Sequence, residues 1–153
     1  MEFGSIEREL RIDAAPEVVY EVVSTPEHLR EWWSDDAEPA VWSDNLRITF
    51  GESGSPDAKS ETLTVVEADP PRRFAFRWVH DEGAHAGSPQ SLLVTFELVP
   101  EGAGTLLRFS ETGYREKGWE AAVLEEAYRD HAAGWDHFLP RLVTYVARLV
   151  STR

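Results

Sequence analysis

The sequence predicts an α+β domain in which a curved antiparallel sheet of about six to seven strands wraps around a long C-terminal helix. Three observations predict it. An apolar and aromatic stripe at helical spacing covers residues 117–150. Between residues 36 and 112, successive short segments alternate apolar and polar side chains, as half-buried strands do. Most turns between these segments are short, which favours antiparallel neighbours with the helices packed on one side.

The C-terminal stripe repeats at steps of three and four residues, which places its members on one face of a helix. At 1.5 Å per residue such a helix is about 40–50 Å long, enough to cross a whole domain. Pro140 removes one backbone hydrogen bond, so we expect one helix with a bend there rather than two helices. Residues 117–124 could form a separate short helix. The stripe consists of Leu124, Tyr128, His131, Trp135, Phe138, Leu142, Tyr145 and Leu149.

The N-terminal part predicts one strand and two short helices. Apolar and charged residues alternate over residues 6–12, which indicates a strand with its apolar side inward. Pro16 suits the first turn of a helix that runs to about Ser24, and Pro26 suits the first turn of the next, with Thr25 as its N-cap. The apolar side of the second helix carries Leu29, Trp32 and Trp33.

The middle of the chain predicts the rest of the sheet. Gly113 ends the last strand before the long helix, and we find no internal repeat. In the segment 62–68 the apolar residues Leu63, Val65 and Val66 do not alternate, so its inward face stays undecided. The expected strands cover residues 37–42, 46–50, 62–68, 74–80, 92–98 and 107–112.

Composition limits the function. A chain of 153 residues predicts a single domain over residues 1–153, and such a domain buries about 70% of the surface that its unfolded chain exposes. The absence of cysteine excludes disulfides and thiolate metal sites, and the five histidines form no recognisable metal-binding set. The net charge of −13 repels nucleic-acid phosphates. No run is apolar enough to cross a bilayer and no signal-peptide pattern opens the chain, so we expect a cytoplasmic protein. We expect no metal or cofactor, because the sequence has no metal-binding set, no phosphate-binding glycine loop and no dinucleotide fingerprint.

Several motifs resemble one protein family. They are residues 15–19 (APEVV), 32–33 (WW), 70–73 (PPRR), 76–78 (FRW), 111–114 (ETGY) and 134–139 (GWDHFL). Together with the order of elements, they resemble the helix-grip fold of the START and pollen-allergen superfamily. The branch is similar to the ATPase activators of the ninety-kilodalton heat-shock chaperone. The resemblance implies a cavity for an apolar or amphipathic small molecule between the sheet and the long helix.

The resemblance does not imply a single function, because relatives include lipid carriers, hormone receptors, polyketide cyclases, proteins that sequester toxic compounds and chaperone activators. Our preferred hypothesis is a non-catalytic protein that binds an apolar or aromatic ligand, lipid-like or polyketide-like. The second is a cyclase or aromatase with Glu111 and His131 as acid and base. The third is a protein-interaction module, such as a chaperone partner, with a filled core.

Glu111 is the candidate residue with the most specific chemistry. Strand alternation places it on the inward face with Leu107 and Phe109, where a carboxylate must find a hydrogen-bond donor or stay protonated. It either reaches solvent or a structural partner at the strand's end, or it hydrogen-bonds a ligand together with His131 or a tyrosine hydroxyl. The residues expected to line the cavity are Trp33, Phe50, Phe76, Trp78, Val94, Phe96, Phe109, Glu111, Tyr128, His131, Trp135 and Phe138.

Overall fold

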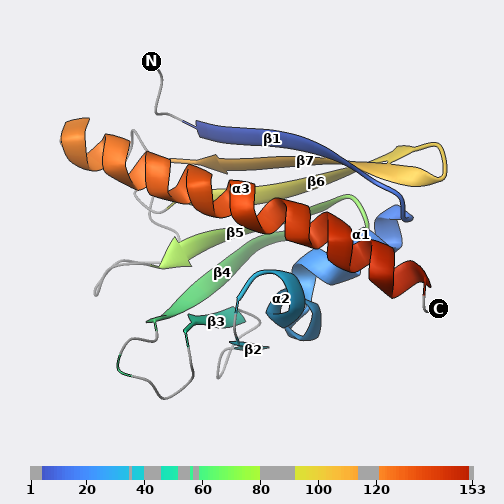
Figure 1. Cartoon of the computed structure of the whole chain (residues 1–153), viewed down its shortest axis with the longest axis horizontal. Helices are drawn as coiled ribbons and strands as arrows, with labels where there is room; N and C mark the ends of the chain where they lie inside the picture. The colour runs from blue at the N-terminus through green and yellow to red at the C-terminus, as the bar shows by residue number, and fades with distance from the viewer. Residues whose placement is uncertain are drawn as a thin grey trace.

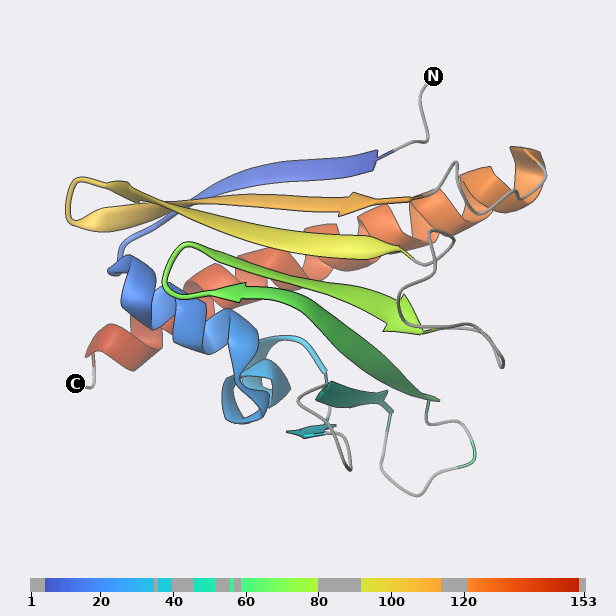
Figure 2. The same ribbon diagram turned by 180° about the vertical axis from the view of Figure 1, so that it is seen from behind.

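The computed structural model describes residues 5–34, 36–39, 46–51, 56, 59–79, 92–113 and 121–151. Its elements are β1 (Ser5–Ile12), α1 (Pro16–Ser24), α2 (Pro26–Trp32), β2 (Asp36–Pro39), β3 (Leu46–Phe50), β4 (Lys59–Asp69), β5 (Arg73–Val79), β6 (Leu93–Glu101), β7 (Gly104–Thr112) and α3 (Ala121–Ser151). The described strands form one antiparallel sheet in the order β1-β7-β6-β5-β4-β3-β2. Helix α3 crosses one face of this sheet (Figure 1), and from behind β7 and β6 lie in front of it (Figure 2). The predicted fold class is confirmed.

Edge strand β1 alternates as its sequence predicts, with Ile6 and Ile12 buried on the side that faces α3. Its backbone carbonyls also find donors. The Tyr128 hydroxyl on α3 donates to the Ser5 carbonyl at 2.9 Å, and the Arg8 guanidinium donates to the Glu7 carbonyl at 2.8 Å. These contacts and the adjacent helix reduce the tendency of an open edge to pair with another chain.

Helices α1 and α2 begin at the two prolines that the sequence assigns to their first turns. Thr25 occupies the N-cap position of α2, but its side chain does not cap the helix. Its hydroxyl instead donates to the Glu21 carbonyl of α1 at 2.7 Å. The predicted N-cap position of Thr25 is confirmed, but its hydroxyl bonds the last turn of α1 instead of the first turn of α2.

A β-bulge in β4 explains why residues 62–68 do not alternate. Val65 pairs with Phe76 of β5, and the register then shifts so that Glu67 pairs with Ala75. The intervening Val66 has no opposite residue and is 47% exposed. One extra residue in a strand reverses the side-chain parity after it. Leu63, before the bulge, lies inward with no exposed area, and no single alternation fits the whole segment.

Helix α3 continues through Pro140, which confirms the prediction of one long helix, and the bend at Pro140 stays a prediction. Residues 121–124 belong to α3, so they form no separate helix, whereas residues 117–120 lie outside the described part of the chain. Residues 40–42 and 80 of the predicted strands also lie outside the described part of the chain. Among the described residues, no helix is long and apolar enough to cross a membrane.

Candidate functional site

Seven aromatic side chains meet between the sheet and α3, and we call them the aromatic cluster. Trp135 of α3 stacks on Trp33 with ring centroids 5.2 Å apart, and its ring lies 4.5 Å from that of Phe109 on β7. Further ring contacts extend the cluster across β6, β5 and β3. Its members are Trp33, Phe50, Phe76, Phe96, Phe109, Trp135 and Phe138.

Glu111 lies beside the aromatic cluster with no exposed area. Alternation along β7 directs its side chain inward, as the sequence predicts. Its Oε1 accepts a hydrogen bond from Trp135 Nε1 at 3.2 Å and lies 2.8 Å from His131 Nδ1. Both partners come from one face of α3, because they are four residues apart. Glu111 therefore does not reach solvent, and α3 supplies the donors that an interior carboxylate needs.

His131 connects this polar group to the outside. Its side chain is 25% exposed, whereas the carboxylate it contacts is fully buried. A hydrogen bond of 2.8 Å joins His131 Nδ1 to Glu111 Oε1. Glu111 thus fixes the orientation of the imidazole ring, an arrangement that proteins use to position histidines. We call Glu111, His131 and Trp135 the polar triad.

The remaining candidate residues occupy different positions. Val94 is buried on β6, directly opposite Glu111 in the register, and Phe50 and Phe138 are half-buried at one end of the aromatic cluster. The Tyr128 hydroxyl donates to the Ser5 carbonyl. Trp78 pairs with Leu63 in the sheet, but its side chain lies outside the described part of the structure.

Sequence reasoning left Trp32 out of the candidate site. It is fully buried, its indole donates to the Val22 carbonyl at 3.1 Å, and its ring lies 5.9 Å from that of Trp33. The adjacent tryptophans Trp32 and Trp33 were the feature of the sequence that could have identified it. However, a short helix alone does not tell which of two adjacent residues faces the sheet.

Arg8 of β1 holds the middle of α3 in place. Its guanidinium donates to both carboxylate oxygens of Asp136 at 2.7 and 3.2 Å. These hydrogen bonds lower the pKa of Asp136 below its ordinary value and raise that of Arg8. Since Asp136 directly follows Trp135, the ion pair helps to fix the register of α3 against β7.

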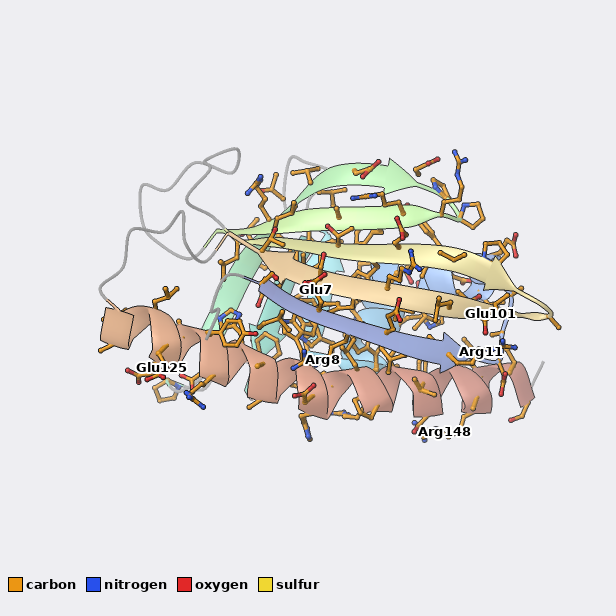
Figure 3. The ribbon with its side chains drawn as sticks, turned by 90° about the horizontal axis from the view of Figure 1, so that it is seen from above. Glu7, Arg8, Arg11, Glu101, Glu125 and Arg148 are labelled. Carbon is orange, nitrogen blue, oxygen red and sulfur yellow. The ribbon has the colours of Figure 1, made fainter. Side chains whose placement is uncertain are left out.

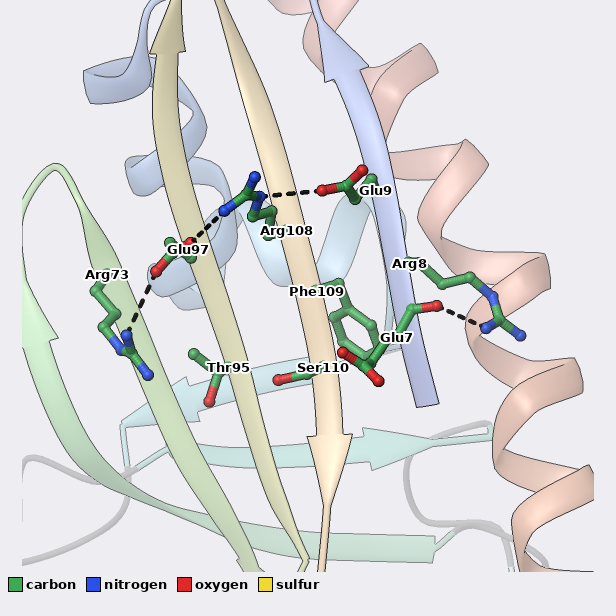
Figure 4. A pocket seen from close by; sticks show the side chains of 9 residues that line it. All are labelled: Glu7, Arg8, Glu9, Arg73, Thr95, Glu97, Arg108, Phe109 and Ser110. Atoms are coloured by element: carbon green, nitrogen blue, oxygen red, sulfur yellow. Dashed lines mark hydrogen bonds and ion pairs between the residues drawn. The ribbon is translucent and has the colours of Figure 1, made fainter. Parts of the chain in front are cut away.

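The opposite face of the sheet carries a hollow of about 570 Å³ whose chemistry is different (Figure 4). Thr95 and Ser110 line it beside a row of alternating charges. Arg73 and Arg108 lie on either side of Glu97, at 3.5 and 3.6 Å from its carboxylate. The complete row, which we call the charge ladder, is Glu67, Arg73, Glu97, Arg108 and Glu9. Each arginine already contacts two carboxylates, so this face suits water better than an apolar ligand.

Residues 13–147 match the family described as activator of Hsp90 ATPase homolog 1-like protein. The chain belongs to this family. No curated protein matches the sequence.

Solved structures share the fold of this family member. The protein MLL2253 from Mesorhizobium loti is 22% identical, with a TM-score of 0.70 over 94% of this chain and 97% of that one. The Aha1 dimer from Colwellia psychrerythraea is 20% identical, with a TM-score of 0.66 over 93% and 95%. DynU16, a putative protein in the dynemicin biosynthetic locus, is 20% identical with a TM-score of 0.66, over 94% of this chain and 47% of that one.

In this family member, the polar triad and the aromatic cluster form a mixed surface between the sheet and α3. The rings can stack on an apolar ligand, and the imidazole can exchange a hydrogen bond with a polar substituent. Among the described residues, no group of three His, Asp or Glu side chains is placed to hold a metal ion.

Proposed function

We propose that this protein binds an apolar or aromatic small molecule between the sheet and α3, with a polar substituent of the ligand at His131. The observation that supports this most is the polar triad itself, where a partly exposed imidazole is fixed by a buried carboxylate at the edge of an aromatic cluster. Ligand sites commonly combine an apolar lining with a few positioned polar groups.

The cost of burying Glu111 favours a role beyond filling space. A carboxylate loses its hydration on burial and needs several hydrogen bonds to offset that loss, and an apolar side chain often serves stability equally well. Here the carboxylate orients an imidazole that solvent can reach. In this proposal His131 contacts the ligand, and Glu111 is a positioning residue.

Ligand entry requires side chains to move, because the rings of the aromatic cluster contact one another in the structure. Phe50 and Phe138, with centroids 6.1 Å apart, are half-buried and therefore the least constrained members. Changes of side-chain rotamer are common when proteins bind ligands. We propose that these two rings separate to admit the ligand and that Trp33 and Trp135 stack on it.

The similarity to DynU16, from the dynemicin biosynthetic locus, supports a small-molecule ligand of lipid-like or polyketide-like character. The protein-interaction alternative has less support. Among the described residues, the large hydrophobic side chains that are exposed are Val66 on β4 and Val123 on α3, which form no contiguous apolar patch. The absence of cysteine is compatible with the cytoplasm, where we place the protein.

A second candidate function is acid–base catalysis on the same bound ligand. The contact of 2.8 Å between Glu111 and His131 favours it, because a carboxylate that orients an imidazole is a common general-base arrangement. A cyclase or aromatase could use this pair while the aromatic cluster holds the substrate in a folded shape.

A ligand panel tests the proposed function. Flavonoids, fatty acids and sterols are titrated into the protein while tryptophan fluorescence is recorded, and native mass spectrometry of protein exposed to cell extract identifies any retained molecule. We expect at least one class to bind saturably. A complete lack of saturable response across the panel, with nothing retained from the extract, would contradict the proposal.

Two histidines of α3 provide a matched pair of variants. His131→Ala should weaken binding of a hydroxylated ligand about tenfold, the scale of one hydrogen bond to an oriented group. His137→Ala, at an exposed position on the same helix, removes a ring 4.9 Å from that of Phe138 and should change affinity by less than about threefold. If the protein is an enzyme, His131→Ala should instead retain binding and lower the rate by about 10²–10⁴. Equal effects of both variants would remove His131 from the site.

A further inference from the structure

A second hollow, of about 240 Å³, lies where α2 meets the C-terminal half of α3. It is separate from the polar triad and from the charge ladder. Figure 3 shows Arg148, one of the residues that line it, projecting from α3 away from the sheet. The lining residues are Glu31, Pro140, Arg141, Thr144 and Arg148.

The arginines of this hollow differ from most others in the structure. Arg8, Arg73 and Arg108 each have carboxylate oxygens within 4 Å. By contrast, Arg141 and Arg148 make no ion pair with any residue that the structure describes. The chain has a net charge of −13, so two guanidinium groups without carboxylate partners beside one hollow make a local positive region in an acidic protein.

The geometry of α3 brings these groups to the same place. Arg141, Thr144 and Arg148 follow one another at steps of three and four residues, so they share one face of the helix. The Arg141 guanidinium lies 5.6 Å from the centroid of the Phe138 ring, within the range of a cation–π interaction. This contact restrains the guanidinium before any ligand arrives and lowers the entropy lost on binding.

We propose that the hollow is a binding site for the phosphate group of a small molecule. The Arg141 and Arg148 guanidiniums donate to its oxygens. Arginine suits this role because its planar group donates several hydrogen bonds in a fixed geometry and always carries its charge. A tetrahedral dianion accepts from two guanidiniums that approach from different turns of a helix, whereas a planar carboxylate offers fewer directions. Glu31 lines the same hollow and weakens the site by repulsion.

Binding of inorganic phosphate tests the site independently of the proposed function. Phosphate is titrated at constant ionic strength against sodium chloride while the arginine side-chain N–H resonances are followed by NMR. Wild-type protein should show saturable shifts at Arg141 and Arg148. Glycerol 3-phosphate in a parallel titration shows whether the remainder of a phosphate ester adds contacts.

Three variants give an expected pattern. Arg148→Gln should weaken phosphate binding about tenfold, the scale of a charge-assisted hydrogen bond. Glu31→Gln should tighten it about two- to fivefold, because a repulsive charge is removed. Arg129→Gln is the matched control on the same helix and should change nothing, since Arg129 is paired with Glu125 at 3.2 Å.

Backbone spectra that overlay with those of wild type establish that each variant is folded. Shifts that grow linearly with phosphate and match the chloride control would overturn the proposal, because they indicate screening alone. An unchanged affinity in Arg148→Gln, or a weaker one in Glu31→Gln, would also overturn it.

Discussion

The two faces of strand β7 each carry a charged side chain, which is buried on the inner face and exposed on the outer face. On the inner face, Glu111 is fully buried and contacts His131 and Trp135 of helix α3. On the outer face, Arg108 is half-exposed and pairs with Glu9 and Glu97 from the two neighbouring strands. A charged group thus has partners from the covering helix on the inner face and partners from the neighbouring strands on the outer face.

The difference predicts where substitutions affect stability most. Exposed ion pairs contribute little because water can replace either partner, so members of the charge ladder are individually dispensable. Beside the aromatic cluster, water cannot replace a lost partner of Glu111. Loss of one donor therefore leaves the buried carboxylate with too few hydrogen bonds. Substitutions should therefore have large effects on the inner face and small effects on the outer one.

Removal of Trp135 should have the largest effect. Trp135→Ala deletes a ring that contacts Trp33 and Phe109 and removes a donor to Glu111. We expect a loss of about 3–5 kcal/mol in the free energy of unfolding, measured by urea denaturation. Ser110→Ala on the outer face of β7 is the control, with an expected change within about 0.5 kcal/mol. Similar losses in both variants would contradict the comparison.

Two glutamates on neighbouring strands sharpen the comparison. Glu111→Gln keeps the shape and removes the charge, and we expect it to cost about 1–3 kcal/mol of unfolding free energy. The same change at Glu97, in the charge ladder, should cost no more than about 1 kcal/mol. Thermal denaturation of the two variants checks this, and a larger loss at Glu97 would reverse our assignment of the two faces.

Substitutions on the two faces should also differ in how their cost depends on salt concentration. Arg108→Gln removes two exposed ion pairs, at 3.0 and 3.6 Å. We expect it to lower the unfolding free energy by no more than about 1 kcal/mol at low ionic strength, and by less in 1 M salt, where the Debye length is about 3 Å. The loss caused by Glu111→Gln should persist in 1 M salt, because its contacts are buried. Equal salt sensitivity would count against this account.

The smallest effect is expected for the Arg8–Asp136 ion pair at the border of the two faces. Hydrogen bonds from Arg8 lower the pKa of Asp136 from its ordinary value of 3.8. The pair therefore contributes stability above that value, and the contribution is lost as the pH falls through the folded-state pKa. Asp136→Asn should cost less than about 1 kcal/mol at pH 7, since the pair is largely exposed. Its difference from wild type in pH-dependent denaturation should vanish in strong acid; a constant difference would exclude this linkage.

Most of the fold follows from periodicity. Alternation along residues 107–112 predicts that Glu111 faces inward, and helical spacing predicts that His131 and Trp135 share a face. The sequence suggests that Glu111 and His131 act on one ligand, but the direct contacts of Glu111 with His131 and Trp135 could not be predicted. They depend on how far α3 slides along the sheet, which is set by packing and by partners distant in sequence, such as Arg8 and Asp136.

Two local features also lay beyond sequence reasoning. The bulge at Val66 shows in the sequence only as missing alternation over residues 62–68, and it can be located only when the partner strand is placed. The Thr25 hydroxyl had two acceptable roles, and the helix that precedes it decides between them. In both cases the decisive neighbour belongs to another element.

The most direct test of the proposed inner-face site follows side-chain N–H resonances while a ligand from the panel is titrated. If the inner face binds the ligand, the Trp135 indole resonance should shift saturably, and the Trp33 indole with it. The Arg73 and Arg108 side-chain resonances of the charge ladder should stay in place. Saturable shifts at the two arginines with an unchanged Trp135 indole would contradict the account, because the ligand would then occupy the outer hollow.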